Sequence, residues 1–332
     1  METVRRTNDS ILIEAKGLTK RFDDVIAIED LSFNIQQGEF FGFLGPNGAG
    51  KTTTINILIG LARPDSGTFR IGGFECSKNP KAAQHLLGVV PDESNLYPEL
   101  TGFDNLCFCA ALYGMPKYKR KNRAVELLET FGLKEAGNRK FGGYSKGMKR
   151  KLTIAAGIIH NPLILFLDEP TTGIDVASAR QIRKLIGKMR SEGKTIFLTT
   201  HYIEEAERLC ERIAFIVNGR IVNTSSIDNL LKPIKQKTAM LISVTENSEN
   251  LVNKLSSEFP QYEFNADTSQ VIRVVSMEAI FIGPLVRFIE ENNIKVTEAK
   301  KVLPSLEDVF VKITGIEADT MKNEKQKQGG KT

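Results

Sequence analysis

The feature that most constrains the fold of this chain is a glycine-rich stretch between two segments of different periodicity. A short apolar run, FFGFL at residues 40–44, predicts a buried strand, and the segment after Lys51, TTTINILI, has the apolar spacing of a helix. Between them, Gly45 and Gly50 are separated by four residues and are followed at once by Lys51 and Thr52. This spacing, in the order strand, loop and helix, is the pattern of a phosphate-binding loop.

Each part of this loop has its own use in phosphate binding. The glycines let backbone N–H groups turn inward around phosphates, and the amino terminus of the following helix adds its partial positive charge. Lys51 supplies a point charge to the outer phosphates, and the hydroxyl of Thr52 suits a magnesium ligand. The predicted nucleotide-binding residues of the loop are Gly45, Pro46, Asn47, Gly48, Ala49, Gly50, Lys51, Thr52 and Thr53. The alternative is an ordinary glycine turn with a solvated Lys51, which the surrounding strand and helix disfavour.

A second apolar run, LILFLDE at residues 163–169, ends in two acids. A buried parallel strand has this pattern, and an open α/β sheet binds its ligands at the carboxyl ends of such strands. Asp168 at the strand end can hold magnesium, directly or through water, and Glu169 could polarise the water that attacks a γ-phosphate. The alternative is an acidic pair that caps a helix before Pro170.

A third apolar segment, KTIFLTTH, predicts a strand that ends at His201, and the amphipathic YIEEAERLCERI after it predicts a helix. A histidine after a strand is more often structural than catalytic. Because this strand is expected to end at the same edge as the loop and the acids, the functional interpretation is a hydrogen bond from His201 to the γ-phosphate.

Length and charge set the broad class. The 332 residues exceed one typical domain, which predicts two domains that each bury a core. The net charge of +5 is the difference between 45 basic and 40 acidic residues, so no overall field indicates DNA or RNA as a partner. The segment KFGGYSKGMKRKL at residues 140–152 carries five cations and no acid, and taken alone it is typical of a nucleic-acid or membrane-surface patch.

Cysteine spacing and hydropathy indicate the cellular compartment in which the protein works. Cys76, Cys107, Cys109 and Cys210 lack the paired spacing of a zinc site, which favours free thiols in a reducing compartment. No apolar run approaches the roughly 18 residues of a membrane span, and METVRRTNDSILIE at the start lacks the apolar core of a secretory signal. We therefore expect a soluble protein that reaches a membrane only through a partner.

Taken in order, GPNGAGKTT, YSKGM, LILFLDEPTTGID and TIFLTTH resemble the motifs of the nucleotide-binding subunit of an ABC transporter, over about Ile11 to Asp228. The resemblance implies an α/β fold of the P-loop NTPase type with a helical subdomain, and binding and hydrolysis of ATP with Mg²⁺. The implied partners are a second copy of the chain, in a head-to-tail dimer, and a transmembrane permease subunit. The permease would hold the chain at the cytoplasmic face of the cell membrane, and no nucleic-acid partner is expected.

The resemblance also assigns residues outside the loop. Ser145 and the backbone at Gly147 would cap the γ-phosphate bound by the other protomer, helped by the dipole of a helix that begins there. The cations of KRKL would then lie along that helix, partly as a solvated face. Asp175 would be the acidic residue of the loop that crosses the dimer interface. Phe22 would lay its ring on adenine, and its alternative is an ordinary core phenylalanine.

Two positions depart from the family's pattern. Lys146, Gly147 and Met148 follow Ser145 where glycine, glycine and glutamine are usual, and an added cation near a polyphosphate is tolerable. Asp92, in VVPDESNLYPELT, stands where the family commonly has glutamine. Aspartate is shorter and anionic, so Asp92 is a candidate magnesium ligand that could also repel Glu169. Metal geometry and coupling to the membrane subunit depend on this position.

The predicted organisation has several parts. They are an amino-terminal extension at 1–10, an ATP-binding domain at 11–230 with a helical subdomain at about 93–160, an accessory α+β domain at 236–315 and a disordered tail at 316–332. The accessory domain has the predicted order strand, helix, two strands, helix, strand, helix, which suggests a ferredoxin-like fold. Ser305 and Asp308 predict a capping box for its last helix. Its end, PSLEDVFVKITG, resembles subunits of the drug, antibiotic and polysaccharide export branch.

The predicted function is an ATPase subunit that dimerises around two ATP molecules, with Lys51, Glu169 and His201 as catalytic residues. One alternative is an ATP-gated regulatory clamp with little hydrolysis, if Asp92 disturbs the metal site. The other is a soluble ABC ATPase that acts on ribosomes or DNA. Proteins of that kind usually carry two cassettes or a coiled-coil insertion, whereas this chain shows one cassette and no such insertion.

Overall fold

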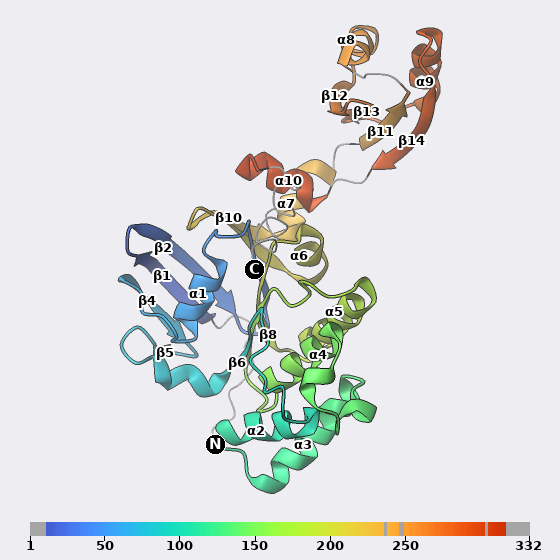
Figure 1. Ribbon diagram of the computed structural model, residues 1–332. Coiled ribbons are helices and arrows are strands. Elements are labelled where there is room, and N and C mark those ends of the chain that lie inside the picture. Colours follow the sequence, from blue (N-terminus) through green and yellow to red (C-terminus); the bar gives the residue numbers. More distant parts are fainter. Residues whose placement is uncertain (1–10, 236–237, 246–248, 303–304, 317–332) are drawn as a thin grey trace. The chain divides into compact units, whose positions relative to one another are not determined.

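The computed structural model of the protein describes residues 11–235, 238–245, 249–302 and 305–316 (Figure 1). These residues divide into two compact units. The first comprises the described residues up to Ser226 together with those from Phe310, and the second runs from Ile227 to Val309. The predicted amino-terminal extension, and the predicted tail except for residue 316, lie outside the described residues.

The first unit is built on a six-stranded sheet with the order β10-β9-β3-β8-β7-β6. Its strands are β3 (Phe40–Leu44), β6 (Leu87–Val90), β7 (Ile164–Asp168), β8 (Thr195–Thr200), β9 (Arg212–Val217) and β10 (Arg220–Ser226). Strands β3, β7 and β8 are buried at every residue and run parallel, as their continuous apolar runs predict. Leu44 lies opposite Thr200, and Asp168 lies opposite Thr199. The carboxyl ends of these three strands therefore meet at one edge, as expected.

A second, antiparallel sheet of the same unit has the order β2-β1-β4-β5. Its strands are β1 (Ile11–Phe22), β2 (Val25–Gln36), β4 (Ser66–Ile71) and β5 (Phe74–Glu75). Phe33 of β2 packs against Phe41 and Phe43 of β3, with ring centroids 5.9 and 5.7 Å apart. The ring of Phe197 on β8 lies within 6.0 Å of all three. This aromatic cluster joins the two sheets into one core.

The helices of the first unit lie mostly between these strands in sequence. They are α1 (Lys51–Leu58), α2 (Gly102–Leu112), α3 (Lys117–Thr130), α4 (Lys146–Gly157), α5 (Val176–Ser191) and α6 (Ile203–Leu209), with short 3₁₀ helices η1 (Pro80–Leu86), η2 (Lys134–Ala136) and η3 (Phe141–Gly143). Helices α2, α3 and α4 pack together as a helical group (Figure 1). Helix α6 is shorter than the predicted helix, because Ile213 at its expected end is buried in β9 beside β3.

The second unit has its own antiparallel sheet, with the order β12-β13-β11-β14. Its elements are α7 (Ile227–Lys235), β11 (Thr238–Val244), α8 (Glu249–Glu258), β12 (Glu263–Thr268), β13 (Val271–Ser276), α9 (Ile282–Glu291) and β14 (Val296–Val302). From β11 to β14 the order of elements and of strands is that of a ferredoxin-like fold, which confirms the prediction. Ile242, Ile272, Leu285 and Ile289 are fully buried and form the centre of its core.

Helix α10 (Leu306–Thr314) begins in the second unit and ends in the first. The predicted capping box is present: the backbone N–H and the hydroxyl of Ser305 both donate to Oδ2 of Asp308 at 3.0 Å. Further along the helix, the buried ring of Phe310 meets Phe215 of β9 edge-on, with centroids 5.3 Å apart. The chain thus leaves the first unit after Ser226 and returns to it at Phe310.

The structure also bears on the expectations about the cysteines and about membrane-spanning segments. Cys76, Cys107, Cys109 and Cys210 are all free thiols, as expected. Throughout the described ranges, every helix is too short or too polar to cross a membrane.

Candidate active site

The glycine-rich loop connects β3 to α1 at the edge where the parallel strands end. A Cβ atom at Gly45 would lie 2.1 Å from the carbonyl oxygen of Ile216, so no side chain fits there. Gly50 has a φ of 102°, and a Cβ atom on it would lie 2.6 Å from the carbonyl oxygen of Ala27. Glycine is needed at both positions, because the loop passes directly against its neighbours in a backbone conformation that other residues avoid.

Helix α1 begins at Lys51 and is well suited to an anion. Its first turn has no side-chain cap and no acidic residue, so no side chain of that turn competes with a phosphate for the positive end of the helix dipole. The Lys51 side chain is 5% exposed and donates to the carbonyl oxygens of Gly45 and Pro46 at 2.8 and 2.9 Å. The ammonium group is thereby folded back over its own loop, where the predicted phosphate contacts lie.

A pocket of about 280 Å³ lies at this loop. It is lined by Val25, Ile26, Ala27, Asn47, Gly48, Gly50, Lys51, Thr52, Thr53, Asp92, Asp168 and Glu169. The pocket therefore unites most of the predicted loop residues with both acids of β7 and with Asp92. Gly45, Pro46 and Ala49 shape the loop without lining the pocket.

Asp168 is held by two threonine hydroxyls. Oγ1 of Thr52 donates to Oδ2 of Asp168 at 3.0 Å, and Oγ1 of Thr199 donates to Oδ1. A hydroxyl and a carboxylate oxygen are the hard donors that Mg²⁺ prefers, so this pair fits the ion. The described residues contain no group of three or more His, Cys, Asp and Glu side chains placed to hold a metal. An ion at Thr52 and Asp168 would therefore complete its coordination with nucleotide oxygens and water.

Glu169 has an unusual backbone conformation. Its φ is 45°, in the left-handed region that residues with side chains seldom adopt, and its N–H donates to the carbonyl of Thr199 at 3.0 Å. Its carboxylate is buried and accepts a hydrogen bond from Oγ1 of Thr172 at 2.9 Å. Strain of this kind persists only where the surroundings hold it, and it often marks a functional site.

His201 lies beside Glu169 without lining the pocket. Its Nδ1 is 2.9 Å from Oε2 of Glu169, although the approach is not aligned as a hydrogen bond. The imidazole is 4% exposed. The structure therefore brings together Lys51, Glu169 and His201, the three residues predicted to be catalytic.

A buried acid that the sequence reasoning did not single out lies behind this group. Glu205 of α6 is 2% exposed and accepts hydrogen bonds from Oγ1 of Thr171 at 2.8 Å and from Oγ1 of Thr200 at 2.9 Å. Burial raises the pKa of the Glu205 carboxyl, and the two hydroxyls oppose that rise. Glu205 ties the loop after Glu169 to the strand end before His201. On an amphipathic helix rich in acids, nothing in the sequence separates it from its exposed neighbours.

Arg150 is the buried member of the cations of KRKL, which were expected to lie along the helix partly as a solvated face. Its side chain is 6% exposed, whereas Lys149 and Lys151 are partly exposed. The guanidinium donates to the backbone carbonyls of Pro91, Asp92, Asp168 and Pro170. Burial lowers the pKa of Arg150, and the nearby acids raise it. Its position three residues after Gly147 and four before Ile154, both buried, is the helical spacing that could have revealed it.

The residues predicted to serve a second protomer form a separate surface. Ser145 is the N-cap of α4, with Oγ accepting from the N–H of Met148 at 3.2 Å, and Asp175 is the N-cap of α5, accepting from the N–H of Ser178 at 2.8 Å. A Cβ atom at Gly147 would lie 2.2 Å from Oγ of Ser178, so the two helix starts are closely packed. Ser145, Gly147 and Asp175 do not line the pocket at the glycine-rich loop.

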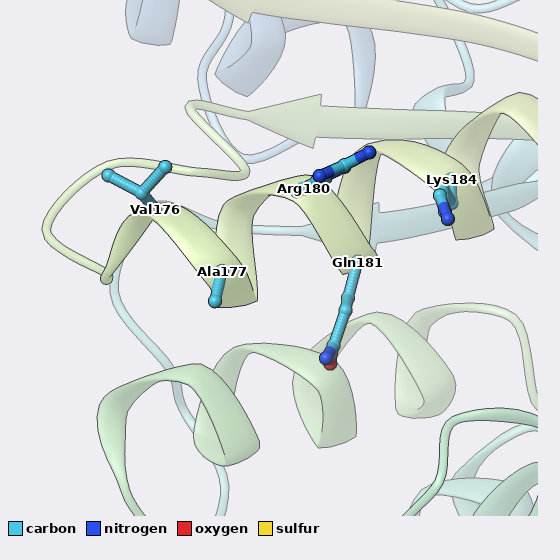
Figure 2. Close-up of a pocket in the computed structure, with 5 residues that line it drawn as sticks. All are labelled: Val176, Ala177, Arg180, Gln181 and Lys184. Carbon is cyan, nitrogen blue, oxygen red and sulfur yellow. The ribbon is translucent and has the colours of Figure 1, made fainter.

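A second pocket follows directly along α5 from Asp175 (Figure 2). It is lined by Val176, Ala177, Arg180, Gln181 and Lys184. Val176 at its start is 83% exposed, the highest value among the exposed large apolar residues that the structure describes. The lining has cations and apolar groups but no acid or nucleophile, so it offers a contact surface rather than catalytic chemistry.

Phe22 does not line the pocket at the glycine-rich loop. It is 50% exposed at the end of β1, with the ammonium of Lys20 5.3 Å from its ring centroid. The alternative of a core phenylalanine is therefore wrong. The apolar wall of the pocket comes from Val25, Ile26 and Ala27, which immediately follow the turn after β1.

Comparison with known proteins gives a consistent result. Residues 28–172 match the family described as ABC transporter. The chain is 33% identical over 311 residues to the linearmycin resistance ATP-binding protein of Bacillus subtilis (strain 168), covering 92% of this chain and 98% of that protein. It is 34% identical over 313 residues to the doxorubicin resistance ATP-binding protein of Mycobacterium tuberculosis (strain ATCC 25618 / H37Rv), covering 92% and 95%.

Solved structures agree with these relatives. A dimeric ATP-binding cassette in a post-hydrolysis state, bound to ADP and Pi, superimposes with a TM-score of 0.60 at 28% identity, over 65% of this chain and 98% of that chain.

Proposed function

The chain belongs to the ABC transporter family as an ATP-binding subunit that hydrolyses ATP, and on this basis we propose that it powers export through a separate transmembrane permease subunit. The observation that carries the proposal is the single pocket in which Lys51, Thr52, Asp168 and Glu169 converge beside His201. These are the groups needed to bind a nucleoside triphosphate and to activate water against it.

The direction of transport is inferred from the relatives. Two proteins that match nearly the whole chain are named for resistance to linearmycin and to doxorubicin. Removal of a toxic compound from the cell is one way in which a transporter confers resistance. The ending PSLEDVFVKITG, with its resemblance to the export branch, supports the same direction.

ATP lies with its phosphates against residues 45–53. The uncapped amino terminus of α1 and the Lys51 ammonium offset the charge of the β- and γ-phosphates. Thr52 and Asp168 would hold Mg²⁺, and the ion would supply positive charge to offset the charge on the phosphate oxygens. Asp92, on the pocket wall, is a further oxygen donor toward the ion. Phe22 covers the adenine, an arrangement that requires its exposed ring to reach the base from beside the pocket.

In hydrolysis, Glu169 is the general base. Its buried carboxylate accepts a proton from the attacking water, and Thr172 orients one of its oxygens. His201, held beside Glu169, donates to the γ-phosphate in the transition state. Lys51 lies 3.5 Å from the other oxygen of Glu169 and stabilises the charge on the transferred group.

Two copies of the chain bind head to tail around two ATP molecules. Ser145 and the backbone at Gly147 cap the γ-phosphate held by the other copy, and Asp175 crosses between the copies. The exposed Val176 next to Asp175 supports this arrangement, because an apolar side chain that is 83% exposed gains by burial against a partner (Figure 2). The dimeric relative provides the precedent for a paired cassette.

The proposed place of the chain in the cell is the inner face of the cell membrane, where the permease holds it. The helical group of α2, α3 and α4 is the part that would meet the permease, since it carries Ser145 and packs against the loop that contains Asp92.

Asp92 favours one alternative function. Asp92 lines the pocket together with Asp168 and Glu169, which brings a third acidic residue to the site. An ATP-gated clamp that closes with little hydrolysis would result if this charge displaced Mg²⁺ from its reactive position.

The test is Mg²⁺-dependent ATP turnover by the purified chain and by Glu169→Gln, with ATP binding measured on both. Turnover by the wild type and binding without turnover by the variant support the base assignment; a variant with wild-type turnover removes Glu169 from the mechanism. Binding without turnover by both, also after addition of the membrane subunit that copurifies with the chain, supports the clamp.

A further inference from the structure

One side chain binds the carbonyl oxygens of the two residues that flank Glu169. Nη2 of Arg150 donates to the carbonyl oxygen of Asp168 at 2.6 Å, and Nε of Arg150 donates to the carbonyl oxygen of Pro170 at 2.8 Å. Between these two carbonyls the chain makes its left-handed turn, with the φ of Glu169 at 45°. The same guanidinium therefore binds the carbonyl of the residue before the proposed base and the carbonyl of the residue after it.

We propose that Arg150 is a positioning residue for Glu169, and that its guanidinium holds the left-handed turn that presents the Glu169 carboxylate to the nucleotide. The proposal rests on the proposed function, in which Glu169 is the general base. Arg150 itself does not touch the pocket: its contacts are with backbone oxygens, and it acts through the residue between them.

The shape of the guanidinium accounts for this role. Nε and Nη2 present two N–H groups in parallel along one edge of a rigid plane, which suits two acceptors at a fixed separation. An unusual φ at a residue with a side chain costs free energy and must be held by its surroundings. Two charge-assisted hydrogen bonds to the flanking carbonyls are sufficient to offset such a cost.

The third nitrogen extends the same constraint to a second segment of the site. Nη1 of Arg150 donates to the carbonyl oxygens of Pro91 and Asp92, the latter at 2.9 Å. One planar group thus fixes the backbone at Asp92 relative to the backbone at Glu169. Asp92 stands where the family commonly has glutamine. The hydrogen bonds of Arg150 therefore limit how closely the carboxylates of Asp92 and Glu169 can approach.

The charges around Arg150 also support its role as a positioning residue for Glu169. The guanidinium is buried among four acids, Asp92, Asp168, Glu169 and Glu205, each of which interacts favourably with it. A buried cation in this place offsets the repulsion among acids that must lie together at a magnesium and phosphate site. The anionic Asp92 is accommodated for the same reason.

The decisive test is a double-mutant cycle between Arg150 and Glu169. Arg150→Lys keeps the charge but cannot bridge two carbonyls along a rigid edge. We expect it to lower kcat by about 10- to 100-fold, the loss that follows a displacement of about 1 Å in a catalytic group, with ATP affinity little changed. In the Glu169→Gln background the same substitution should leave the residual turnover unchanged, because no base remains to be positioned.

Two controls separate positioning from folding. Turnover is expressed per ATP-binding site, so that a misfolded fraction does not count, and Arg150→Gln provides a neutral second variant. Arg190→Lys is the matched control, because Arg190 donates through Nε and Nη2 to one exposed acid, Glu211, on the same unit. Its turnover should equal that of the wild type.

The outcomes are distinct. A large loss in the wild-type background and none in the Glu169→Gln background supports the proposal. Equal losses in both backgrounds, or no loss of kcat with Arg150→Lys and Arg150→Gln, would overturn it and leave the base assignment intact. Wild-type turnover by Glu169→Gln alone would instead overturn the proposed function, and the positioning role with it.

Discussion

The Nζ atom of Lys51 lies 3.5 Å from Oε1 of Glu169 across the floor of the candidate active site. Both side chains are almost fully buried, and the ammonium is also bound by the carbonyls of Gly45 and Pro46. The phosphate-binding cation and the proposed base are therefore electrostatic neighbours, and a γ-phosphate would bind between groups that already attract each other.

Lys51→Met should weaken ATP binding by at least about tenfold, the equivalent of one hydrogen bond to a charged group. Methionine has a similar length but neither charge nor donor. Nucleotide affinity is measured by titration of a fluorescent ATP analogue. Lys188→Met, at an exposed position on α5, is the control and should bind as the wild type does. Equal affinity of Lys51→Met and wild type would remove Lys51 from the phosphate contacts.

Thr52→Val should raise the Mg²⁺ concentration needed for half-maximal turnover by at least about tenfold, because it removes one of the proposed oxygen donors without changing the side chain's shape. Chelation of Mg²⁺ should abolish turnover in the wild type. Turnover is followed by phosphate release across a magnesium titration, with Thr130→Val on α3 as the control. An unaltered magnesium requirement in Thr52→Val would contradict the proposed ligand pair.

Ser145→Asp should prevent ATP-dependent dimerisation more strongly than Ser145→Asn. Both replacements can cap α4 in the way that Ser145 does, so the helix start is kept in each. Only aspartate brings a negative charge toward the phosphate of the other copy. Dimer formation is measured by size-exclusion chromatography with ATP in a Glu169→Gln background. Equal effects of the two replacements would argue against a phosphate contact at Ser145.

Phe197→Ala should reduce the free energy of unfolding by about 3–5 kcal/mol. The ring is fully buried and contacts Phe33, Phe41, Phe43 and Phe166, so its loss leaves a cavity where the two sheets of the first unit meet. Chemical denaturation monitored by circular dichroism gives the value. Phe74→Ala, at a partly exposed position on β5, should cost much less. Similar losses for Phe197→Ala and Phe74→Ala would contradict the assignment of Phe197 to the centre of the core.

His160 should make the stability of the chain depend on pH. Its ring stacks on Tyr113 at 3.5 Å, and Nε2 lies 2.9 Å from the carbonyl oxygen of Leu87. Burial lowers the pKa of His160 below its ordinary 6.5, which the carbonyl contact opposes. The unfolded chain therefore binds this proton first, so stability from the neutral ring is present above pH 6.5 and is lost as the pH falls through the folded-state pKa.

The measurement is the difference in Tm between about pH 7.5 and about pH 5. It should be larger for the wild type than for His160→Gln, which cannot titrate in this range. Equal differences for the two proteins would mean that His160 does not contribute to the acid sensitivity.

Local patterns were sufficient to predict the elements that carry the site. The runs FFGFL, LILFLDE and KTIFLTTH became β3, β7 and β8, since strands buried on both faces need continuous apolar residues. Strand β7 ends at Asp168, the first polar residue after its apolar run, whereas β8 continues through two buried threonines and ends at Thr200, one residue before the predicted end at His201. The accessory unit was also predictable, because its alternating short strands and helices are each marked by local periodicity.

What the sequence could not supply are features created by packing between distant segments. The left-handed turn at Glu169 is held by Arg150, which lies 19 positions earlier on another element, as their residue numbers give. Arg150 and Glu205 are buried where they meet backbone or hydroxyl groups of other elements. Helical spacing places Arg150 on the buried face of α4 without showing its partners, and no pattern along α6 separates Glu205 from its exposed neighbours. The helix after His201 was predicted to run to Ile213, but α6 ends at Leu209. Ile213 instead belongs to β9, whose partner β3 lies far away in the sequence.

The return of the chain at Phe310 bears on how this protein is synthesised. The ring of Phe215 acquires its edge-on neighbour only from α10, so the ATP-binding unit is complete only after the whole ferredoxin-like unit has been translated. During elongation on the ribosome, Phe215 of β9 lacks this neighbour while residues 227–309 are synthesised and form their own sheet. A fragment that stops at residue 230 would keep that apolar face uncovered permanently, and aggregation would be its expected fate.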